Sequence, residues 1–468
     1  MNPLEQLRAQ GAVIERLSSD SRRVGPGVAF VAYPGERADG RMHIPDALAR
    51  GASGVLWEEA RFEWRAEWRA PNVPVAGLKQ HAGALAHELY GRPSESLWVC
   101  GVTGTNGKTS CSQWIAALLS RAGTKCGVVG TLGGGFPGSL HDLGNTTPDA
   151  LELHRALKDM KAAGAAAVAM EVSSHGLVQG RVNAVRFSCA LFTNLSHDHL
   201  DYHGSLEAYA EAKARLFDMP ALETAVLNID DPLGASLATR LRMRVIGYSQ
   251  AGDATLTGRS DGESIHVRSP WGEASVKLNQ VGTFNVSNAL GVLGCLVAKG
   301  LPFGDAAQML AALPPVPGRM QVVAQKPLVV VDYAHTPDAL EKVLQALRPA
   351  AAQRGGRLVV VFGAGGDRDA AKRPLMGAVA ARLADRVVLT SDNPRSEDPL
   401  AILEQIARGV NVAHELEPDR ARAIERALAK AAARDVVLIA GKGHEDYQEI
   451  AGERLPFSDE KVVQRVLG

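Results

Sequence analysis

The sequence has no excess of either charge and no long apolar run, and both absences exclude classes of protein. Lys plus Arg and Asp plus Glu each number 51, so the formal net charge is zero. A neutral chain has no overall field that would attract DNA, RNA or anionic lipid. No stretch of about 18 apolar residues occurs, as a membrane-spanning helix would need. We therefore expect no nucleic-acid partner and no membrane insertion.

The first residues also lack the features of a secretion signal. Residues 1–13 contain no apolar run between a basic start and a cleavage site. This pattern favours a cytoplasmic protein.

Cysteine is scarce, and its spacing excludes two further classes. There are five, far apart and without a C-x-x-C pair: Cys100, Cys111, Cys126, Cys189 and Cys295. An odd number at such spacing argues against a disulfide framework and against a zinc knuckle. We expect these side chains to be small buried hydrophobes in a reducing compartment.

The length predicts more than one domain, because single cores stop growing near about 250 to 300 residues. The chain has 468 residues and no repeat or low-complexity tract. Segments rich in proline and glycine indicate domain boundaries, at Gly91-Arg92-Pro93-Ser94 and before Pro317-Gly318-Arg319. We expect an α/β protein of three domains, over residues 1–90, 91–317 and 318–468.

Apolar runs alternate with amphipathic stretches in the second and third blocks. In the second, strands are expected at 97–100, 166–172, 190–192 and 225–227, with helices at 108–122, 148–163 and 206–217. This alternation is typical of a mostly parallel sheet covered on both faces. In the third, strands at 328–331, 358–362, 386–390 and 436–440 alternate with helices at 337–347, 372–384, 399–408 and 419–432. That block is predicted to be Rossmann-like, but its one glycine-rich turn at 363–367 is weak evidence for a dinucleotide, and we do not predict NAD.

The strongest local signal is a glycine-rich loop between an expected strand and an expected helix. It reads Gly101-Val102-Thr103-Gly104-Thr105-Asn106-Gly107-Lys108-Thr109. In such a P-loop the backbone N–H groups and the Lys ammonium surround phosphate oxygens, while the Thr hydroxyl ligates Mg²⁺. The loop is a variant, because the usual spacing places glycine at Val102. A purely structural tight turn is the alternative, but it would not need Gly, Lys and Thr in this order.

Acidic and histidine-rich segments follow two other expected strands. Glu171 is expected at the carboxyl edge of the sheet, where ligands bind in open α/β folds. It could be a Mg²⁺ ligand, and the alternative is a solvated residue at the end of a strand. The segment from Asn194 to His203 holds three histidines and two aspartates, which also fits zinc. Beside a P-loop, contacts to Mg²⁺ and phosphate are the better interpretation. No N-K-x-D guanine motif occurs, so ATP is favoured over GTP.

Taken together, these motifs resemble the Mur ligases and the related folylpolyglutamate synthetases. Beyond the loop, segments that match the Mur branch in order are 145–148, 170–177, 194–203, 284–289, 317–319 and 332–335. The resemblance runs from about Asp20 to Gln448. It implies a UDP-substrate domain, a central ATPase and a C-terminal domain that closes over an amino acid.

Three more segments resemble the branch of the family that adds meso-diaminopimelate to UDP-N-acetylmuramoyl-L-alanyl-D-glutamate. They are residues 366–369, 392–395 and 441–445. The resemblance implies an ADP-forming ligase of cell-wall peptidoglycan precursors that needs ATP and Mg²⁺ and works on small molecules as a monomer. A lysine-adding Mur ligase and a non-ligase P-loop ATPase remain the alternatives.

The family's functional positions carry over by motif. For the UDP-substrate they are Ser19, Ser21, Glu36, Arg37, Ala38, Asn145, Thr146, Thr147, Ser173, Gln179 and Arg181, with Glu36 at a position that more often holds His. For ATP they are Gly104, Thr105, Asn106, Gly107, Lys108, Thr109, Ser110, Asn285, Arg319, Asp332 and His335. For diaminopimelate they are Arg368, Asp392, Asn393, Pro394, Arg395, Gly441 and Glu445.

The resemblance also implies the catalytic and metal-binding groups. The catalytic residues would be Lys108, Lys213, His197 and Glu171, and the metal ligands Thr109, Glu171, His197 and Lys213. Lys213 matches a lysine that is carbamylated in this family, since a neutral amine that captures CO₂ becomes an anionic ligand for Mg²⁺. From the sequence alone Lys213 would be a solvated helix residue. Arg395 fits the extra carboxylate of diaminopimelate, and Asp392 and Glu445 fit its ammonium.

Overall fold

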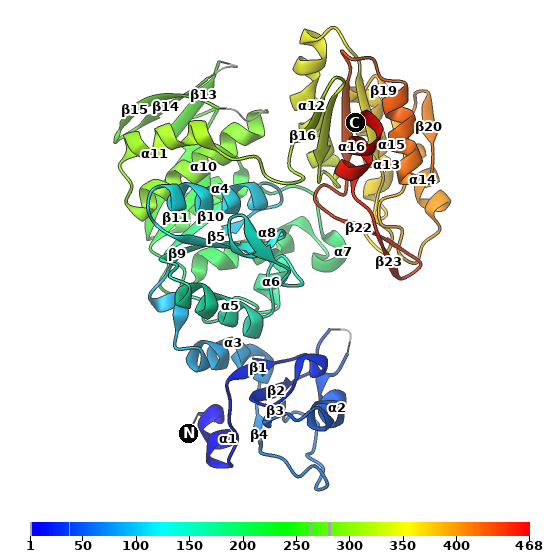
Figure 1. The fold of residues 1–468 in the computed structure, drawn as a ribbon. Helices are drawn as coiled ribbons and strands as arrows, with labels where there is room; N and C mark the ends of the chain where they lie inside the picture. Colours follow the sequence, from blue (N-terminus) through cyan, green and yellow to red (C-terminus); the bar gives the residue numbers. More distant parts are fainter. Residues whose placement is uncertain (1, 37, 262–263, 279–281) are drawn as a thin grey trace.

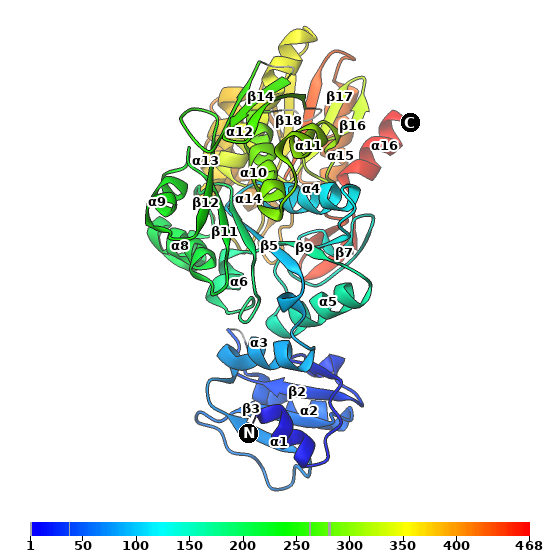
Figure 2. The ribbon, with the colours of Figure 1, turned by 90° about the vertical axis from the view of Figure 1, so that its left-hand side faces the viewer.

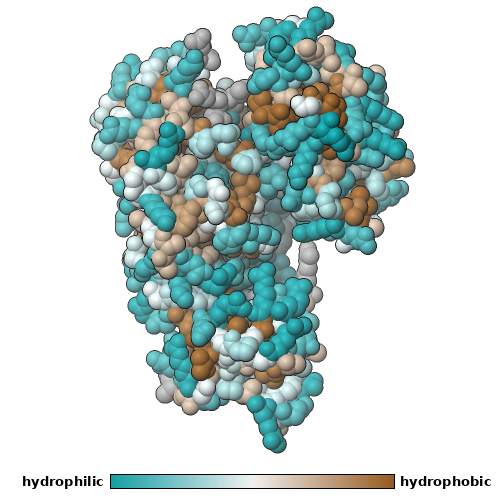
Figure 3. Space-filling view, viewed as in Figure 1, coloured by the Kyte–Doolittle hydropathy of each residue, from teal (hydrophilic) through white to brown (hydrophobic). Residues whose placement is uncertain are grey.

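The computed structural model describes every residue except 1, 37, 262–263 and 279–281. Three parts follow one another along the chain (Figure 1). The N-terminal part lies at one end, and the C-terminal part lies beside the central part at the other. The face in Figure 3 is mainly hydrophilic, with a notch between these two larger parts at its upper edge. No helix within the described ranges is long and apolar enough to span a membrane.

The described residues of the N-terminal part form a parallel sheet in the order β1-β2-β3-β4, accompanied by the α-helices α1, α2 and α3. Its elements are α1 Pro3–Ala9, β1 Arg16–Ser18, β2 Val28–Ala32, α2 Ile44–Ala49, β3 Gly54–Glu58, β4 Asn72–Val75 and α3 Leu78–Leu89. Helix α3 faces the central part (Figures 1 and 2), and a Cβ added at Gly83 would lie 2.4 Å from the Asn183 carbonyl oxygen. Glycine therefore permits this close approach.

The central part is built on a sheet ordered β15-β14-β13-β12-β11-β10-β5-β9-β6-β7-β8. Its first half contains β5 Trp98–Thr103, α4 Lys108–Arg121, β6 Cys126–Gly130, β7 Gly133–Phe136, β8 Ser139–His141, α5 Ala150–Ala162, β9 Ala167–Glu171, α6 Ser174–Val178 and β10 Cys189–Phe192. Its second half contains α7 Leu200–His203, α8 Leu206–Ala214, β11 Thr224–Asn228, α9 Pro232–Arg240, β12 Arg244–Ser249, β13 Leu256–Ser260, β14 Ser264–Ser269, β15 Gly272–Lys277, α10 Thr283–Lys299 and α11 Phe303–Met309.

The middle strands of this sheet are parallel and buried on both faces. Along β5, Cys100 and Val102 face the helices α4, α10 and α11, whereas Val99 faces the side covered by α5 and α9. Strands paired in parallel run from β13 to β6, as the sequence predicts. Antiparallel strands extend both edges, and these were not expected. Strand β5 thus delivers the glycine-rich loop to the middle of the sheet.

The C-terminal part has a sheet ordered β16-β17-β21-β18-β19-β20, with only β16 antiparallel. Its elements are β16 Gln321–Gln325, β17 Leu328–Asp332, α12 Pro337–Gln353, β18 Leu358–Phe362, α13 Lys372–Leu383, β19 Arg386–Leu389, α14 Pro399–Ala407, β20 His414–Leu416, α15 Arg420–Ala429, β21 Val436–Ala440, β22 Tyr447–Ile450, β23 Glu453–Pro456 and α16 Asp459–Leu467. Helices α12, α13 and α14 cover one face, and α15 and α16 cover the other. The predicted Rossmann-like α/β arrangement is confirmed.

Candidate functional site

The loop between β5 and α4 has glycines where no side chain fits. Gly104 and Gly107 have φ values of 146° and 86°. A Cβ at Gly104 would lie 1.9 Å from Thr193 Oγ1, and one at Gly107 would lie 2.5 Å from Asn288 Oδ1. Lys108, the first residue of α4, donates from Nζ to the carbonyl oxygens of Gly104 and Thr105, both at 2.9 Å. The loop is thus a tight cradle with an ammonium folded over it.

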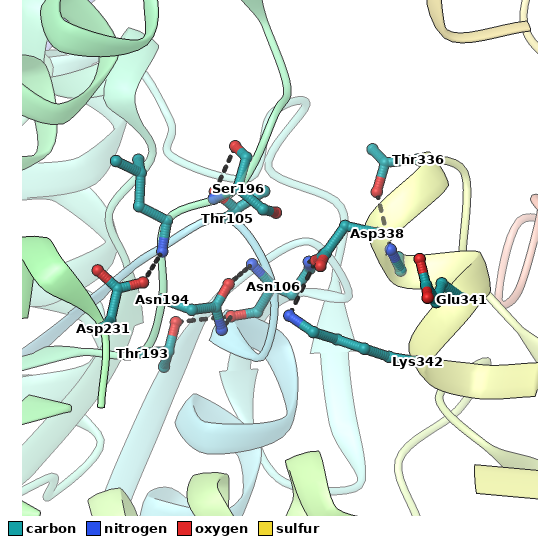
Figure 4. Close-up of polar contacts among 12 residues, drawn as sticks. Thr105, Asn106, Thr193, Asn194, Ser196, Asp231, Thr336, Asp338, Glu341 and Lys342 are labelled. Atoms are coloured by element: carbon teal, nitrogen blue, oxygen red, sulfur yellow. Dashed lines mark hydrogen bonds and ion pairs between the residues drawn. The ribbon is translucent and has the colours of Figure 1, made fainter. Parts of the chain in front are cut away.

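The tip of this loop is held by two parts of the molecule (Figure 4). The backbone N–H of Asn106 donates to Asn194 Oδ1 at 3.0 Å, and its carbonyl accepts from Thr193 Oγ1 at 2.6 Å. On the other side, Asn106 Nδ2 donates to Asp338 Oδ2 on α12 at 3.0 Å, and Lys342 Nζ pairs with the same oxygen at 2.9 Å. The C-terminal part therefore contacts the tip of the loop directly.

A buried carboxylate stands next to the loop's threonine. Glu171, which is 1% exposed at the end of β9, accepts hydrogen bonds from the hydroxyls of Thr109 at 3.0 Å and Thr131 at 3.1 Å. Arg319 donates to Thr109 Oγ1 at 3.0 Å and stacks 4.3 Å from the centre of the Tyr333 ring. Hydroxyl and carboxylate oxygens are the donors that Mg²⁺ prefers, so this pair fits that ion.

Lys213 on α8 is buried, not solvated, so the expectation from the sequence alone was wrong. Its side chain is 1% exposed, and Nζ donates to the Gly104 carbonyl at 2.8 Å and lies 4.2 Å from the centre of the Tyr209 ring. Burial, and next to it the Lys108 charge, hold the pKa of Lys213 well below its usual value. A neutral amine is thereby favoured beside the loop, and a neutral amine is the form that captures CO₂.

A cavity of about 540 Å³ opens between the central and C-terminal parts, in front of the loop. Most residues assigned to ATP line it: Thr105, Asn106, Gly107, Lys108, Thr109, Ser110, Asn285, Arg319, Asp332 and His335. Asp332 is held by the N–H groups of Met320 and Ala334, and burial raises the pKa of its carboxyl. Burial lowers the pKa of His335, which disfavours its charged form. The cavity has the size and lining of a nucleotide site.

The histidine-rich segment is arranged differently from the expectation. His197 is exposed and does not line the cavity, whereas Asp198 and His199 do. Burial lowers the pKa of His199 to about 3, which keeps its imidazole neutral. Burial opposes ionisation of Asp198, but attraction to neighbouring basic groups, among them Lys372 and Lys108, outweighs it and holds the pKa of Asp198 below its usual value. The alternation of side chains along an irregular loop could not be read from the sequence.

The UDP-substrate positions gather where the N-terminal part meets the central part. Glu36 Oε1 accepts from Gln179 Nε2 and from the Tyr202 hydroxyl, both at 2.9 Å. Arg181 donates to the Thr147 carbonyl at 2.8 Å and to Gln179 Oε1 at 2.7 Å. Arg37 lies outside the described residues.

The remaining UDP-substrate positions differ in exposure. Ser19 and Ser21 are partly exposed, Ala38 and Asn145 are exposed, and Thr147 is buried. Thr146 hydrogen bonds to Thr131 at 3.1 Å, and the Ser173 hydroxyl caps α6 by accepting from Gly176 N–H. Thr131, which sequence reasoning missed, thus connects this region to Glu171.

The diaminopimelate positions lie at the carboxyl ends of β18, β19 and β21. Asn393 Nδ2 donates to Glu445 Oε2 at 2.9 Å, and Lys442, which is fully buried, donates to both side chains. Arg395 has a φ of 53° and donates to the Gly366 carbonyl at 2.7 Å. Among the described residues, Asp392 Oδ2 is buried without a hydrogen-bond partner.

Three other positions complete this region. A Cβ at Gly441 would lie 2.4 Å from Asp392 Oδ2, Pro394 is buried, and Arg368 is exposed. Lys442 was not singled out from the sequence, because a lysine between two glycines gives no sign of burial.

The cysteines are buried and free, as expected. Cys100, Cys189 and Cys295 meet in the central core, and the sulfur atoms of Cys100 and Cys295 are 3.8 Å apart. They form part of the apolar packing between the sheet and α10.

Comparison with known proteins agrees with this geometry. Three family models match consecutive segments: the Mur ligase family catalytic domain at 5–90, the Mur ligase middle domain at 102–296 and the Mur ligase glutamate ligase domain at 318–443. The chain therefore belongs to the Mur ligase family.

Individual relatives share nearly the whole chain. The UDP-N-acetylmuramoyl-L-alanyl-D-glutamate–2,6-diaminopimelate ligase of Chromobacterium violaceum is 50% identical over 98% of this chain and 96% of its own. The enzyme of the same name from Ralstonia nicotianae is 51% identical over 99% and 95%. A solved structure with that name is 38% identical, with a TM-score of 0.68 over 97% of this chain and 94% of its own.

Proposed function

We propose that this chain is the ligase that adds meso-diaminopimelate to UDP-N-acetylmuramoyl-L-alanyl-D-glutamate, with conversion of ATP to ADP and phosphate. It is an enzyme of peptidoglycan precursor synthesis. The observation that carries this proposal is one cavity lined by a phosphate loop, a buried carboxylate and cationic residues from two parts of the chain. Relatives about half identical over nearly the full length support the choice of substrates.

ATP binds with its triphosphate on the loop 104–110. The N–H groups of the loop, the start of α4 and the Lys108 ammonium attract phosphate oxygens. Thr109 and Glu171 would hold Mg²⁺, with Lys213 contributing as its carbamate. Bound there, the ion would supply positive charge beside the phosphates and the attacking carboxylate. Arg319 adds a guanidinium from the border of the C-terminal part, 3.0 Å from Thr109.

The chemistry takes two steps. The γ-carboxylate of the D-glutamate attacks the γ-phosphorus of ATP, which gives an acyl phosphate and releases ADP. The amine of diaminopimelate then attacks the acyl carbon, loses a proton and displaces phosphate, which leaves an amide. Because two anions meet in the first step, cations must surround the site, and Lys108 and Arg319 supply them.

The sugar-peptide binds between the N-terminal and central parts. Ser19 and Glu36 face the uridine side, and Thr147, Gln179 and Arg181 face the peptide side. The contact between Glu36 and Gln179 supports this arrangement, because it already joins the two parts at 2.9 Å. His197, exposed and outside the cavity, has no step in this mechanism and stays a prediction from the family resemblance.

Diaminopimelate binds at the carboxyl edge of the C-terminal sheet. The Arg395 guanidinium takes its distal carboxylate, and Asp392 and Glu445 take the neighbouring ammonium. The partnerless Asp392 oxygen supports this role, because a buried carboxylate oxygen normally has a partner. Lysine lacks the distal carboxylate, so Arg395 distinguishes the two amino acids.

One assay tests the proposal. Purified protein is supplied with ATP, Mg²⁺ and UDP-muramoyl dipeptide, and ADP release is followed with meso-diaminopimelate or L-lysine. We expect turnover with diaminopimelate and little with lysine. Equal or better turnover with lysine would identify a lysine-adding ligase, and ADP release without either organic substrate would identify a simple ATPase.

A further inference from the structure

A fully buried ion pair joins the first residues of the last two long helices. Arg420 begins α15 and Asp459 begins α16, and both side chains are 0% exposed. Nε donates to Asp459 Oδ1 at 2.7 Å, and Nη2 donates to Oδ2 at 2.8 Å. A buried pair of this kind is often no more stabilising than packed hydrophobic residues, so its presence calls for a further explanation.

The rest of the guanidinium contacts two strand ends. Nη1 donates to the Ser391 carbonyl at 3.2 Å, and Nη2 donates to the Ala440 carbonyl at 3.0 Å. Ser391 follows β19 and directly precedes Asp392, whereas Ala440 ends β21 and directly precedes Gly441. Strands β19 and β21 are not neighbours, because β18 lies between them. One side chain therefore links two separated strands at the point where each enters a substrate loop.

The charge of this guanidinium also reaches the same loops. Arg420 interacts electrostatically with Asp392 and Glu445, although its direct partner is Asp459. Asp459 therefore keeps the Arg420 charge balanced and leaves Asp392 available to a cationic ligand, whereas Glu445 already pairs with Lys442 at 2.8 Å. If Asp459 lost its charge, the attraction of Arg420 for Asp392 and Glu445 would compete with the substrate ammonium.

The geometry points to Arg420 as a positioning residue for the amino-acid substrate, with Asp459 as its partner. This inference rests on the proposed function. Arg420 fixes the distance between the loop that carries Asp392 and Arg395 and the loop that carries Glu445. Only arginine can do so, because a lysine ammonium cannot hold a carboxylate through two parallel bonds and also reach two carbonyls.

The same domain contains a control ion pair. Arg357 pairs with Asp435 at 3.0 Å; the Asp435 side chain is 1% exposed and the Arg357 side chain 53%. These residues precede β18 and β21, so this pair lies at the opposite, amino ends of the strands. It stabilises the same sheet without touching a substrate loop.

The test compares Arg420→Lys and Asp459→Asn with Arg357→Lys and Asp435→Asn. Steady-state kinetics give the KM for diaminopimelate and for ATP, and thermal unfolding gives Tm. We expect Tm to fall in both pairs. Only Arg420→Lys and Asp459→Asn should raise the KM for diaminopimelate, by about ten- to a hundredfold, the usual range for displaced supporting groups, with the KM for ATP unchanged.

Two outcomes would overturn the inference. One is an equal rise of both KM values, and the other is the same rise in the Arg357→Lys protein. If Arg420→Lys does not fold, Asp459→Asn decides, because the carboxamide has the shape of the carboxylate. Failure of the proposed function is distinguishable, since the wild-type protein itself would then not use diaminopimelate. If the wild type uses lysine, the KM for lysine is compared with the KM for ATP in the same variants.

Discussion

Around the nucleotide loop, position is fixed by main-chain groups and small polar side chains, whereas the loops of the C-terminal part are fixed by buried charges. Gly104 and Gly107 let the first loop turn tightly, and Thr193 and Asn194 hold its backbone. The second region relies on Lys442 and Arg420, both fully buried. Phosphate binding needs a loop of defined shape, which main-chain groups provide. Recognition of a zwitterion needs charged side chains whose orientation is held by other charged side chains.

Lys108→Ala is the strongest test of the first region. It removes the ammonium above the loop, so kcat/KM should fall on the order of 10³-fold, as when a group that stabilises the transition state is lost. ADP release with both organic substrates measures the effect. Lys161→Ala, at an exposed position on α5, is the control and should behave as wild type. Amide formation at a normal rate in the Lys108→Ala protein would contradict the mechanism.

Lys213→Met tests the role of the buried Lys213 amine beside the nucleotide loop. Activity should fall by about 100-fold, because the carbamate ligand is lost. The free energy of unfolding of this variant should rise, in contrast to its activity. The folded-state pKa of Lys213 lies below its ordinary value of 10.5, so unfolding takes up a proton between the two values. The free energy of unfolding of the wild type in CO₂-free buffer should therefore rise with pH up to the ordinary lysine pKa of 10.5.

The pH dependence distinguishes the variant from the wild type. Lys213→Met should be more stable than wild type at neutral pH, and the difference should shrink as pH rises. Denaturant unfolding at pH 7 and pH 9 measures it. A difference that is the same at both pH values would show that Lys213 is charged when buried.

Gly107→Ala tests the role of shape, with Gly123→Ala as its matched control. Both glycines have a φ of 86°, so both variants carry the same backbone strain, about 1 to 2 kcal/mol. A Cβ at Gly107 would meet Asn288 Oδ1, whereas one at Gly123 would have nothing within 4 Å. Only Gly107→Ala should weaken ATP binding, by about tenfold or more. Titration of ATP binding measures this, and equal affinities would refute the steric argument.

Arg395→Ala tests the second region and should give the most selective effect. Its KM for diaminopimelate should rise about tenfold, because one charge-assisted contact is lost, with the KM for ATP unchanged. Arg454→Ala is the control, since Arg454 is an exposed neighbour that stacks on Tyr447. If the two KM values of Arg395→Ala rise together, Arg395 supports the domain and does not select the substrate.

The same contrast explains what could be predicted from the sequence. The parallel strands are nearly continuous apolar runs, and the P-loop is a contiguous segment, so both were readable. The antiparallel pair β14 and β15 was missed: β14 alternates between buried and exposed residues, but β15 has a single buried residue and gives no such pattern. Lys213 and Lys442 are ordinary lysines in sequence, and their burial depends on contacts with distant segments. His197 was assigned from the family resemblance, and an irregular loop gives no period from which to infer which of its side chains face the cavity.

The hydrogen bond between Asn106 and Asp338 has a practical consequence. Because the tip of the phosphate loop is tied to α12, movement of that helix would break this hydrogen bond, while Thr193 and Asn194 still hold the loop's backbone. A small molecule inserted between α12 and the loop would occupy the cavity that also takes ATP. High cellular concentrations of nucleotide would then protect the enzyme against such an inhibitor.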